Sequence, residues 1–241
     1  MHIPFCAKKC SYCDFHFSTQ FEAYRNDMVS AIVKEIELRQ NEALNPLESI
    51  YFGGGTPSLL KKKELSLILE SINKYYKKKE RIEVTLEANP DDLSREKIII
   101  LKEAGINRIS LGIQSFDDKV LKFLNRAHTG NDALASILEL RKQGITNFSV
   151  DLIHSIPGQD DEMLKQNLER VINLAPQHIS VYSLTIEEKT VFGKWQARGQ
   201  LKAVEETQSA GQFELVMDTL TGSGYKHYEI SNFSLPGLAS K

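Results

Sequence analysis

Short runs of alternating apolar and polar residues recur along the chain at intervals of roughly 30 residues, which is the size of a βαβ unit. These runs predict strands at residues 50–52, 82–87, 108–114, 148–153 and 178–184. Between them apolar residues return every three or four positions, as at Leu65, Ile68, Leu69 and Ile72, and this spacing predicts helices. Strands that alternate strictly with helices indicate an α/β fold, with a parallel sheet and helices outside it.

Each predicted strand has one apolar and one polar face. Val84 and Leu86 would face the helices, leaving Glu83, Thr85 and Glu87 on the opposite side. A sheet covered by helices on both faces usually shows continuous apolar runs instead. The pattern therefore favours a partial (β/α)6 TIM-like barrel, with parallel strands around a lumen that can hold a polar ligand.

Unusual residues follow the strands. Gly-Gly-Gly-Thr-Pro comes after the second strand at 53–57, Glu-Ala-Asn-Pro at 87–90 after the third, and Gln-Ser-Phe at 114–116 after the fourth. Asp151 lies in the fifth strand, and a cysteine loop would follow the first. Because barrel active sites lie at the carboxyl ends of the strands, we expect this chemistry to meet at one mouth.

Composition excludes several classes of partner. The 241 residues suit one barrel, and 30 basic residues nearly cancel 32 acidic ones. We therefore expect no nucleic-acid partner and no attraction to anionic lipid. No apolar run approaches the roughly 20 residues of a transmembrane segment, and cysteines within the first ten residues argue against a secretory signal. Three cysteines, an odd count, fit a reducing cytoplasmic location.

The three cysteines are Cys6, Cys10 and Cys13, spaced Cys-x3-Cys-x2-Cys. They are too close for ordinary disulfide pairing and one short of a closed zinc site. Thiolates suit iron–sulfur clusters, which usually take four of them, so three would leave one iron open. Two alternatives stay open: incidental thiols, or a zinc site completed by His2 or His16.

The spacing resembles the signature of the radical S-adenosylmethionine (SAM) enzymes, in which SAM chelates the open iron. Longer strings make the chain similar to one group of them, the oxygen-independent coproporphyrinogen III oxidases and the HemW haem chaperones. These strings lie at 2–15, 53–58, 87–90, 108–116, 125–128 and 228–233. The resemblance implies a barrel of the radical SAM type and a [4Fe-4S] cluster on Cys6, Cys10 and Cys13.

The same resemblance implies contacts with SAM, and it assigns no catalytic residue. The implied contacts are Tyr12, Gly54, Gly55, Thr56, Glu87, Gln114, Arg126 and Asp151. Glycine lets the backbone approach a ligand closely, and the forked guanidinium of arginine suits a carboxylate. Two alternatives are structural: Tyr12 as a core aromatic, and an ion pair involving Arg126 and Asp151 inside the barrel.

Phe15 distinguishes the two branches of the group. The oxidases carry a further cysteine two residues after the third, where this chain has Phe15. We therefore favour a HemW-like chaperone, which implies haem, acceptor haemoproteins and an electron donor for the cluster. Coproporphyrinogen III oxidation to protoporphyrinogen IX is the alternative, so enzymatic activity stays open. A zinc-binding barrel without a cluster is a third possibility.

The resemblance also predicts a division of the chain. Residues 1–200 would form the radical SAM core with a truncated first strand. Residues 201–241 would form a helix and a terminal strand that lead into a C-terminal domain that is missing here. One departure stands out: His-Ser-Ile at 154–156 replaces the Tyr-Gly-Leu typical of that loop.

Overall fold

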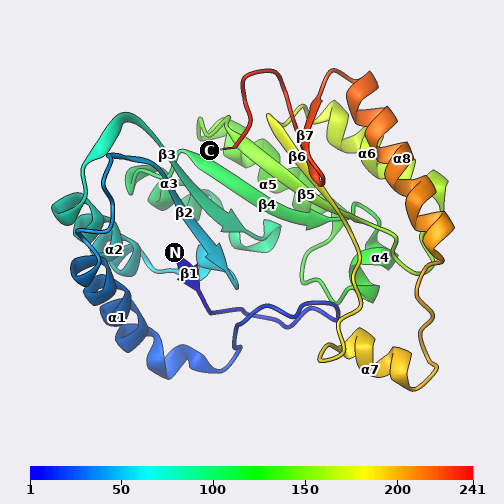
Figure 1. Cartoon of the computed structure of the whole chain (residues 1–241), viewed down its shortest axis with the longest axis horizontal. Coiled ribbons are helices and arrows are strands. Elements are labelled where there is room, and N and C mark those ends of the chain that lie inside the picture. The colour runs from blue at the N-terminus through cyan, green and yellow to red at the C-terminus, as the bar shows by residue number, and fades with distance from the viewer. Residues whose placement is uncertain (241) are drawn as a thin grey trace.

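The computed structural model describes residues 1–240, so the last residue of the predicted 201–241 segment lies outside it. Its sheet has the strand order β1-β2-β3-β4-β5-β6-β8-β7 (Figure 1). The strands are β1 (His2–Ile3), β2 (Leu47–Gly54), β3 (Lys78–Ala88), β4 (Arg108–Gln114), β5 (Phe148–His154), β6 (His178–Ser183), β7 (Lys226–Glu229) and β8 (Asn232–Ser234).

The helices occupy the segments between these strands. They are α1 (Arg25–Leu38), α2 (Lys62–Tyr75), α3 (Arg95–Glu103), α4 (Asp118–Phe123), α5 (Gly130–Lys142), α6 (Asp161–Asn173), α7 (Val191–Ala197) and α8 (Glu206–Gly222). In Figure 1, α1 and α2 lie at one end of the sheet, and α6 and α8 at the other. Among the described residues, no helix is long and apolar enough to cross a membrane.

The first six strands are parallel and follow one another in chain order. This arrangement confirms the predicted parallel α/β sheet. The sheet does not close: β1 lies at one edge, and the antiparallel pair β8 and β7 follows β6 at the other. Two short strands follow α8, because the chain reverses after Glu229, whose carboxylate accepts from the Ser231 amide at 3.2 Å.

Polar residues fix the starts of three helices, α3, α5 and α6. Ser94 caps α3 by accepting from the Lys97 amide, and Asp160 caps α6 by accepting from the Met163 amide. At α5, Thr129 and Asp132 form a reciprocal capping box. Each of these side chains satisfies an amide that has no partner within the helix, which fixes where the helix begins.

The apolar face of the sheet packs against the helices in one large core. Phe52, Leu86, Leu111 and Val150 supply it from neighbouring strands, and all are fully buried. The opposite face carries hydrogen-bonded polar groups, such as the Ser149 hydroxyl, which donates to Ser110 at 2.9 Å. The predicted division into an apolar outer face and a polar lumen is therefore correct.

Candidate functional site

A cavity of about 560 Å³, the strand-end cavity, lies at the carboxyl ends of the parallel strands. This volume is in the range of small-molecule sites. The predicted site residues that line it are Cys6, Cys10, Tyr12, Cys13, Gly54, Gly55, Thr56, Glu87, Gln114 and Asp151. The structure thus brings together residues from the ends of four strands, β2 to β5, and from the cysteine loop, while Arg126 stands directly behind the wall.

The cysteine loop is held at three places by backbone hydrogen bonds. Before it, β1 pairs with Gly53 and Gly54 at the end of β2. Within it, the Cys6 amide donates to Ser18 at 3.1 Å, and the Ser11 amide donates to Leu124 at 3.1 Å. The loop is therefore fixed between the sheet edge and the segment after α4, with its sulfurs toward the cavity.

Two glycines let the end of β2 approach this loop. A Cβ at Gly55 would lie 2.6 Å from the Phe5 carbonyl oxygen and 3.1 Å from Cys6 Sγ. Gly54 has φ +117°, and a Cβ there would lie 2.6 Å from His2 Nδ1. Close approach and a left-handed backbone together explain why side chains are excluded here.

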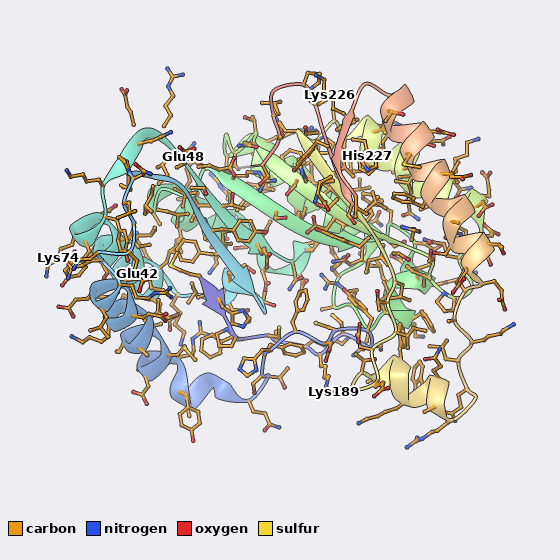
Figure 2. All side chains as sticks on the ribbon, viewed as in Figure 1. Glu42, Glu48, Lys74, Lys189, Lys226 and His227 are labelled. Atoms are coloured by element: carbon orange, nitrogen blue, oxygen red, sulfur yellow. The ribbon has the colours of Figure 1, made fainter. Side chains whose placement is uncertain are left out.

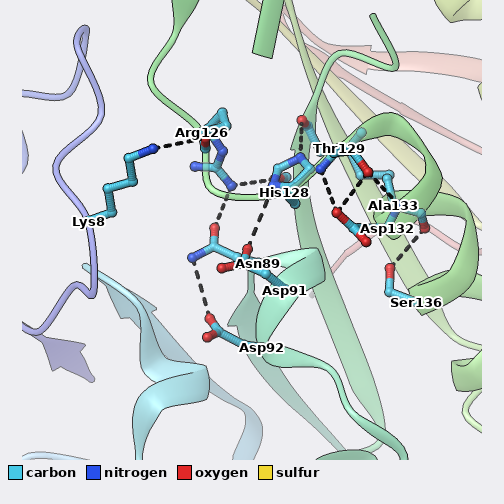
Figure 3. Close-up of polar contacts among 12 residues, drawn as sticks. Lys8, Asn89, Asp91, Asp92, Arg126, His128, Thr129, Asp132, Ala133 and Ser136 are labelled. Atoms are coloured by element: carbon cyan, nitrogen blue, oxygen red, sulfur yellow. Dashed lines mark hydrogen bonds and ion pairs between the residues drawn. The ribbon is translucent and has the colours of Figure 1, made fainter. Parts of the chain in front are cut away.

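Arg126 connects the cysteine loop to two strand ends. Its Nη1 donates to Cys10 Sγ at 3.4 Å, and its Nη2 donates to Asn89 Oδ1 at 2.5 Å and to the Gly112 carbonyl at 2.7 Å. Figure 3 shows Arg126 and Asn89, together with Lys8, whose Nζ donates to the Arg126 carbonyl at 3.2 Å. Within residues 1–240 Arg126 and Asp151 form no ion pair, so the alternative of a structural pair between them is wrong.

Glu87 faces the same cavity from the end of β3. It accepts from the Tyr51 hydroxyl at 2.8 Å and from the Gly54 amide at 3.1 Å. Burial raises the pKa of this carboxyl above its usual value, and these two hydrogen bonds act in the opposite direction. Glu87 therefore also braces the glycine segment against β3.

Asp151 lies deeper, on the lumen side of β5. The Ser110 hydroxyl donates to its Oδ2 at 3.3 Å. Burial raises the pKa of Asp151 to about 6, although hydrogen bonds from Ser180 and Ser110 oppose the shift. A carboxyl group with such a pKa can exchange a proton near neutral pH.

Gln114 adopts a backbone conformation that sequence reasoning missed. Its φ is +70°, and the pairing of β4 with β5 shifts register between Gly112 and Gln114. Such a conformation is uncommon outside glycine and is found at functional sites. The bulge re-aims the end of β4, and Gln114 lines the cavity there.

Tyr12 lies between the cavity and the protein core. It lines the strand-end cavity and also packs against a small core that includes Leu124 and Phe192. Burial raises the pKa of its hydroxyl, which stays protonated at neutral pH.

Three polar contacts complete the site. Thr56 Oγ1 donates to Cys6 Sγ at 3.4 Å, and Asn89 Nδ2 lies 3.4 Å from Thr56 Oγ1. Asn125 Nδ2 donates to the Lys9 carbonyl at 2.7 Å. Asn89 and Asn125 were not among the predicted contacts, although both stand in the strings at 87–90 and 125–128 that carry the resemblance.

A family model described as the radical SAM superfamily matches residues 1–171. The chain belongs to the radical SAM superfamily. It is 40% identical over its whole length to "Heme chaperone HemW" of Lactococcus lactis, covering 62% of that protein, and 38% identical to the Bacillus subtilis protein of the same name, covering 64%. The chain thus spans about three fifths of the length of these relatives.

Among solved structures, the radical SAM enzyme coproporphyrinogen III oxidase (HemN) from Escherichia coli superposes with a TM-score of 0.85 at 26% identity. The match covers 98% of this chain and 55% of that one. The archaeal Elp3 of Methanocaldococcus infernus, at a TM-score of 0.62 and 20% identity, shares the fold.

Cys6, Cys10 and Cys13 line the same cavity, and cysteine thiolates are the ligands of iron–sulfur clusters. Among the residues that the structure describes, no group of three or more Cys, His, Asp or Glu side chains is arranged to hold a single metal ion. Burial raises the pKa of both the Cys6 and Cys13 thiols, and Thr56 and Arg126 supply donors that favour thiolate.

Proposed function

We propose that this chain forms the core of a haem chaperone of the HemW type. It would bind a [4Fe-4S] cluster on Cys6, Cys10 and Cys13, SAM beside the open iron, and haem, which it passes to acceptor haemoproteins. The observation that carries the proposal is the match to proteins named heme chaperone, at 40% and 38% identity over the entire chain. Phe15, which stands where the oxidases have an additional cysteine, supports the same branch.

The chain's own residues would position the cofactors. Thr56 and Arg126 donate hydrogen bonds to the sulfurs of Cys6 and Cys10, which would ligate the cluster, and Gly54 and Gly55 would open the wall for the methionyl part of SAM. The cluster, when bound, supplies the electron that can cleave SAM, while the protein orients SAM and keeps water out.

Further contacts to SAM are proposed for the cavity walls. Tyr12 would pack near the adenine, and Gln114 would reach the polar part of the cofactor. Glu87 and Asp151 would accept hydrogen bonds from its amino and ribose groups, and their position in the cavity lining supports this role.

The proposal includes a setting for the protein. An electron donor would reduce the cluster, no nucleic acid would take part, and the cytoplasm would keep the three thiols reduced. Residues 1–200 would act as the radical SAM core, and α8 with the β7–β8 hairpin would connect it to the remainder of a longer protein.

Anaerobic reconstitution of the full-length gene product tests the function. We expect about four irons for each chain, SAM-dependent changes in the cluster spectrum, and a haem-induced absorbance change followed by transfer to an apo-haemoprotein. Absence of haem binding by cluster-loaded protein would remove the chaperone function. Zinc in place of iron and sulfide would favour a zinc-binding barrel instead.

Coproporphyrinogen III oxidation is the second candidate, because the HemN barrel superposes on 98% of the chain. It predicts conversion of coproporphyrinogen III to protoporphyrinogen IX with formation of methionine. We expect no such turnover from the wild type. A Phe15→Cys variant, assayed alongside it, shows whether the missing cysteine alone prevents that activity, since Phe15 is 70% exposed and can be replaced without disturbing the core.

A further inference from the structure

A second cavity, of about 470 Å³, lies outside the site described above. We name it the α8 cavity, because its walls come from α8, the ends of β5 and β6, and the turn between β7 and β8. The walls are mainly apolar, with Val181, Val204, Phe213 and Ile230. Ser183 lines both this cavity and the strand-end cavity, so the two are neighbours.

His154, at the end of β5, lines the α8 cavity although only 2% of its surface is exposed. Ser155 Oγ lies 2.8 Å from its Nδ1 and 2.7 Å from Ser209 Oγ. A proton on Nδ1 donated to Ser155, with Ser155 donating to Ser209, satisfies this chain and leaves Nε2 with a free lone pair. A hydrogen bond from Nδ1 that fixes the ring is the usual support for a metal-ligating histidine.

The backbone is strained where it presents this histidine. Ser155 has φ +57°, in the left-handed region that costs a residue with a side chain about 1–2 kcal/mol. The Ser155 amide is held by Gln212 Oε1 of α8 at 2.8 Å, so tertiary contacts maintain the strained turn. Burial lowers the pKa of His154 to about 4, which keeps the imidazole neutral near pH 7.

A single imidazole does not make a site for a free metal ion. Among the residues that the structure describes, no group of three or more His, Cys, Asp or Glu side chains could hold such an ion. A metal already held by a macrocycle needs only one or two ligands from the protein. The α8 cavity offers one neutral nitrogen, an aromatic ring in Phe213 stacked 6.2 Å from His154, and aliphatic side chains, with Glu206 and three serines supplying the polar part of the wall.

We propose that the α8 cavity is a haem site in which Nε2 of His154 is an axial ligand of the iron. The Nε2 lone pair binds the iron and displaces a weak axial ligand such as water, with no change of oxidation state. This inference rests on the proposed chaperone function and names its haem ligand. It also places the haem beside the strand-end cavity, with Ser183 between them.

Spectroscopy of the cluster-loaded full-length protein tests this site. Ferric haem is titrated into the wild type and into His154→Ala, His154→Tyr and His227→Ala. His227 is the matched control, because it lies on β7 (Figure 2), its ring is 6.1 Å from that of Phe213 in the cavity wall, and its Nε2 donates to the Ile230 carbonyl at 3.0 Å. Circular dichroism and iron content verify that each variant retains its fold and cluster.

We expect His154→Ala to bind haem at least tenfold more weakly, with a shifted Soret band that added imidazole restores. His154→Tyr should retain haem but show the charge-transfer band of a tyrosinate ligand, whereas His227→Ala should resemble the wild type. The proposed ligand would be overturned, with the chaperone function left intact, if both His154 variants showed the wild-type haem spectrum and bound haem within twofold of the wild-type affinity. A wild type that binds no haem would instead remove that function.

Discussion

Arg126 donates to the sulfur of Cys10 at 3.4 Å, across 116 positions of sequence. The same guanidinium bonds to Asn89 and to the Gly112 carbonyl, so one side chain ties the cysteine loop to the ends of β3 and β4. This contact relates the metal ligands directly to the wall of the strand-end cavity. Substitution of Arg126 therefore tests how the cysteine loop is held.

Arg126→Lys should loosen the cysteine loop even though it keeps the positive charge. An ammonium group cannot reach three partners in the fork geometry of a guanidinium. We expect a loss of about 2–4 kcal/mol in stability, because buried acceptors lose their donors. Less iron should also be retained after anaerobic reconstitution and desalting. The exposed Lys122→Ala on α4 is the control, and equal iron retention in both variants would contradict the role of Arg126.

Gly55→Ala should lower the cluster content by more than its effect on the overall stability of the protein would explain. The new methyl group would meet the Phe5 carbonyl oxygen at 2.6 Å and Cys6 Sγ at 3.1 Å, so the loop must move. Iron counting and the melting temperature measure the two effects separately.

Gly211→Ala in α8 is the matched control for that substitution. No atom lies within 4 Å of the Cβ position at Gly211, and alanine is favoured in a helix by about 0.5–1 kcal/mol. We expect Gly211→Ala to be slightly stabilising and to leave iron content unchanged. Retention of a full cluster by Gly55→Ala would show that the close approach does not matter.

Asp151 should give the ligand-free protein an unusual dependence on pH. Its pKa is about 6 in the folded state and near 4 when unfolded, so the folded state binds more protons between these values. The stability contribution of a protonated Asp151 is therefore complete below about pH 4 and is lost as pH rises toward 6.

Asp151→Asn should remove this pH dependence of the free energy of unfolding. We expect the change in the wild type to amount to about 1–3 kcal/mol between pH 4 and pH 6. Urea unfolding at several pH values measures it, and the exposed Asp218→Asn on α8 is the control. A difference between wild type and Asp151→Asn that is constant from pH 4 to 7 would show that Asp151 does not titrate in this range.

At Ser155 the usual order of stability, in which an alanine variant is more stable than a glycine variant, should be inverted. Because φ is +57°, Ser155→Gly should be more stable than Ser155→Ala by about 1 kcal/mol, although both lose the hydrogen bonds to His154 and Ser209. At Gly211, within a regular helix, alanine should be the better residue. Thermal unfolding of the two Ser155 variants compares them directly, and a more stable alanine variant would rule out strain at this turn.

Much of the fold follows from local pattern. Alternation of apolar and polar residues located the five strands, and β4 begins and ends where it was predicted. β3 begins earlier, at Lys78, because Leu47 of β2 pairs with that polar segment. Sequence pattern did not predict α4, α7 or the pairing of β7 with β8, because each of these elements is too short to show a period of apolar residues.

The sequence predicted which segments form the site, but it did not predict the hydrogen bonds and backbone conformations within it. Strand ends in a parallel barrel must meet at one mouth, so the grouping of Glu87 with Asp151 follows from topology alone. The hydrogen bond from Arg126 to Cys10 depends on how two distant loops fold over each other. The left-handed backbone of Gln114 arises from a register shift that no local preference of glutamine would produce.

The short antiparallel strand β7 at one border of the sheet has a consequence for how copies of this chain meet. Within the described residues this border consists of only four residues. So few unpaired amides and carbonyls offer little template for a foreign strand. Pairing of a second copy along β7 is therefore disfavoured, and it should not limit oxygen-free handling at the high protein concentrations that spectroscopy requires.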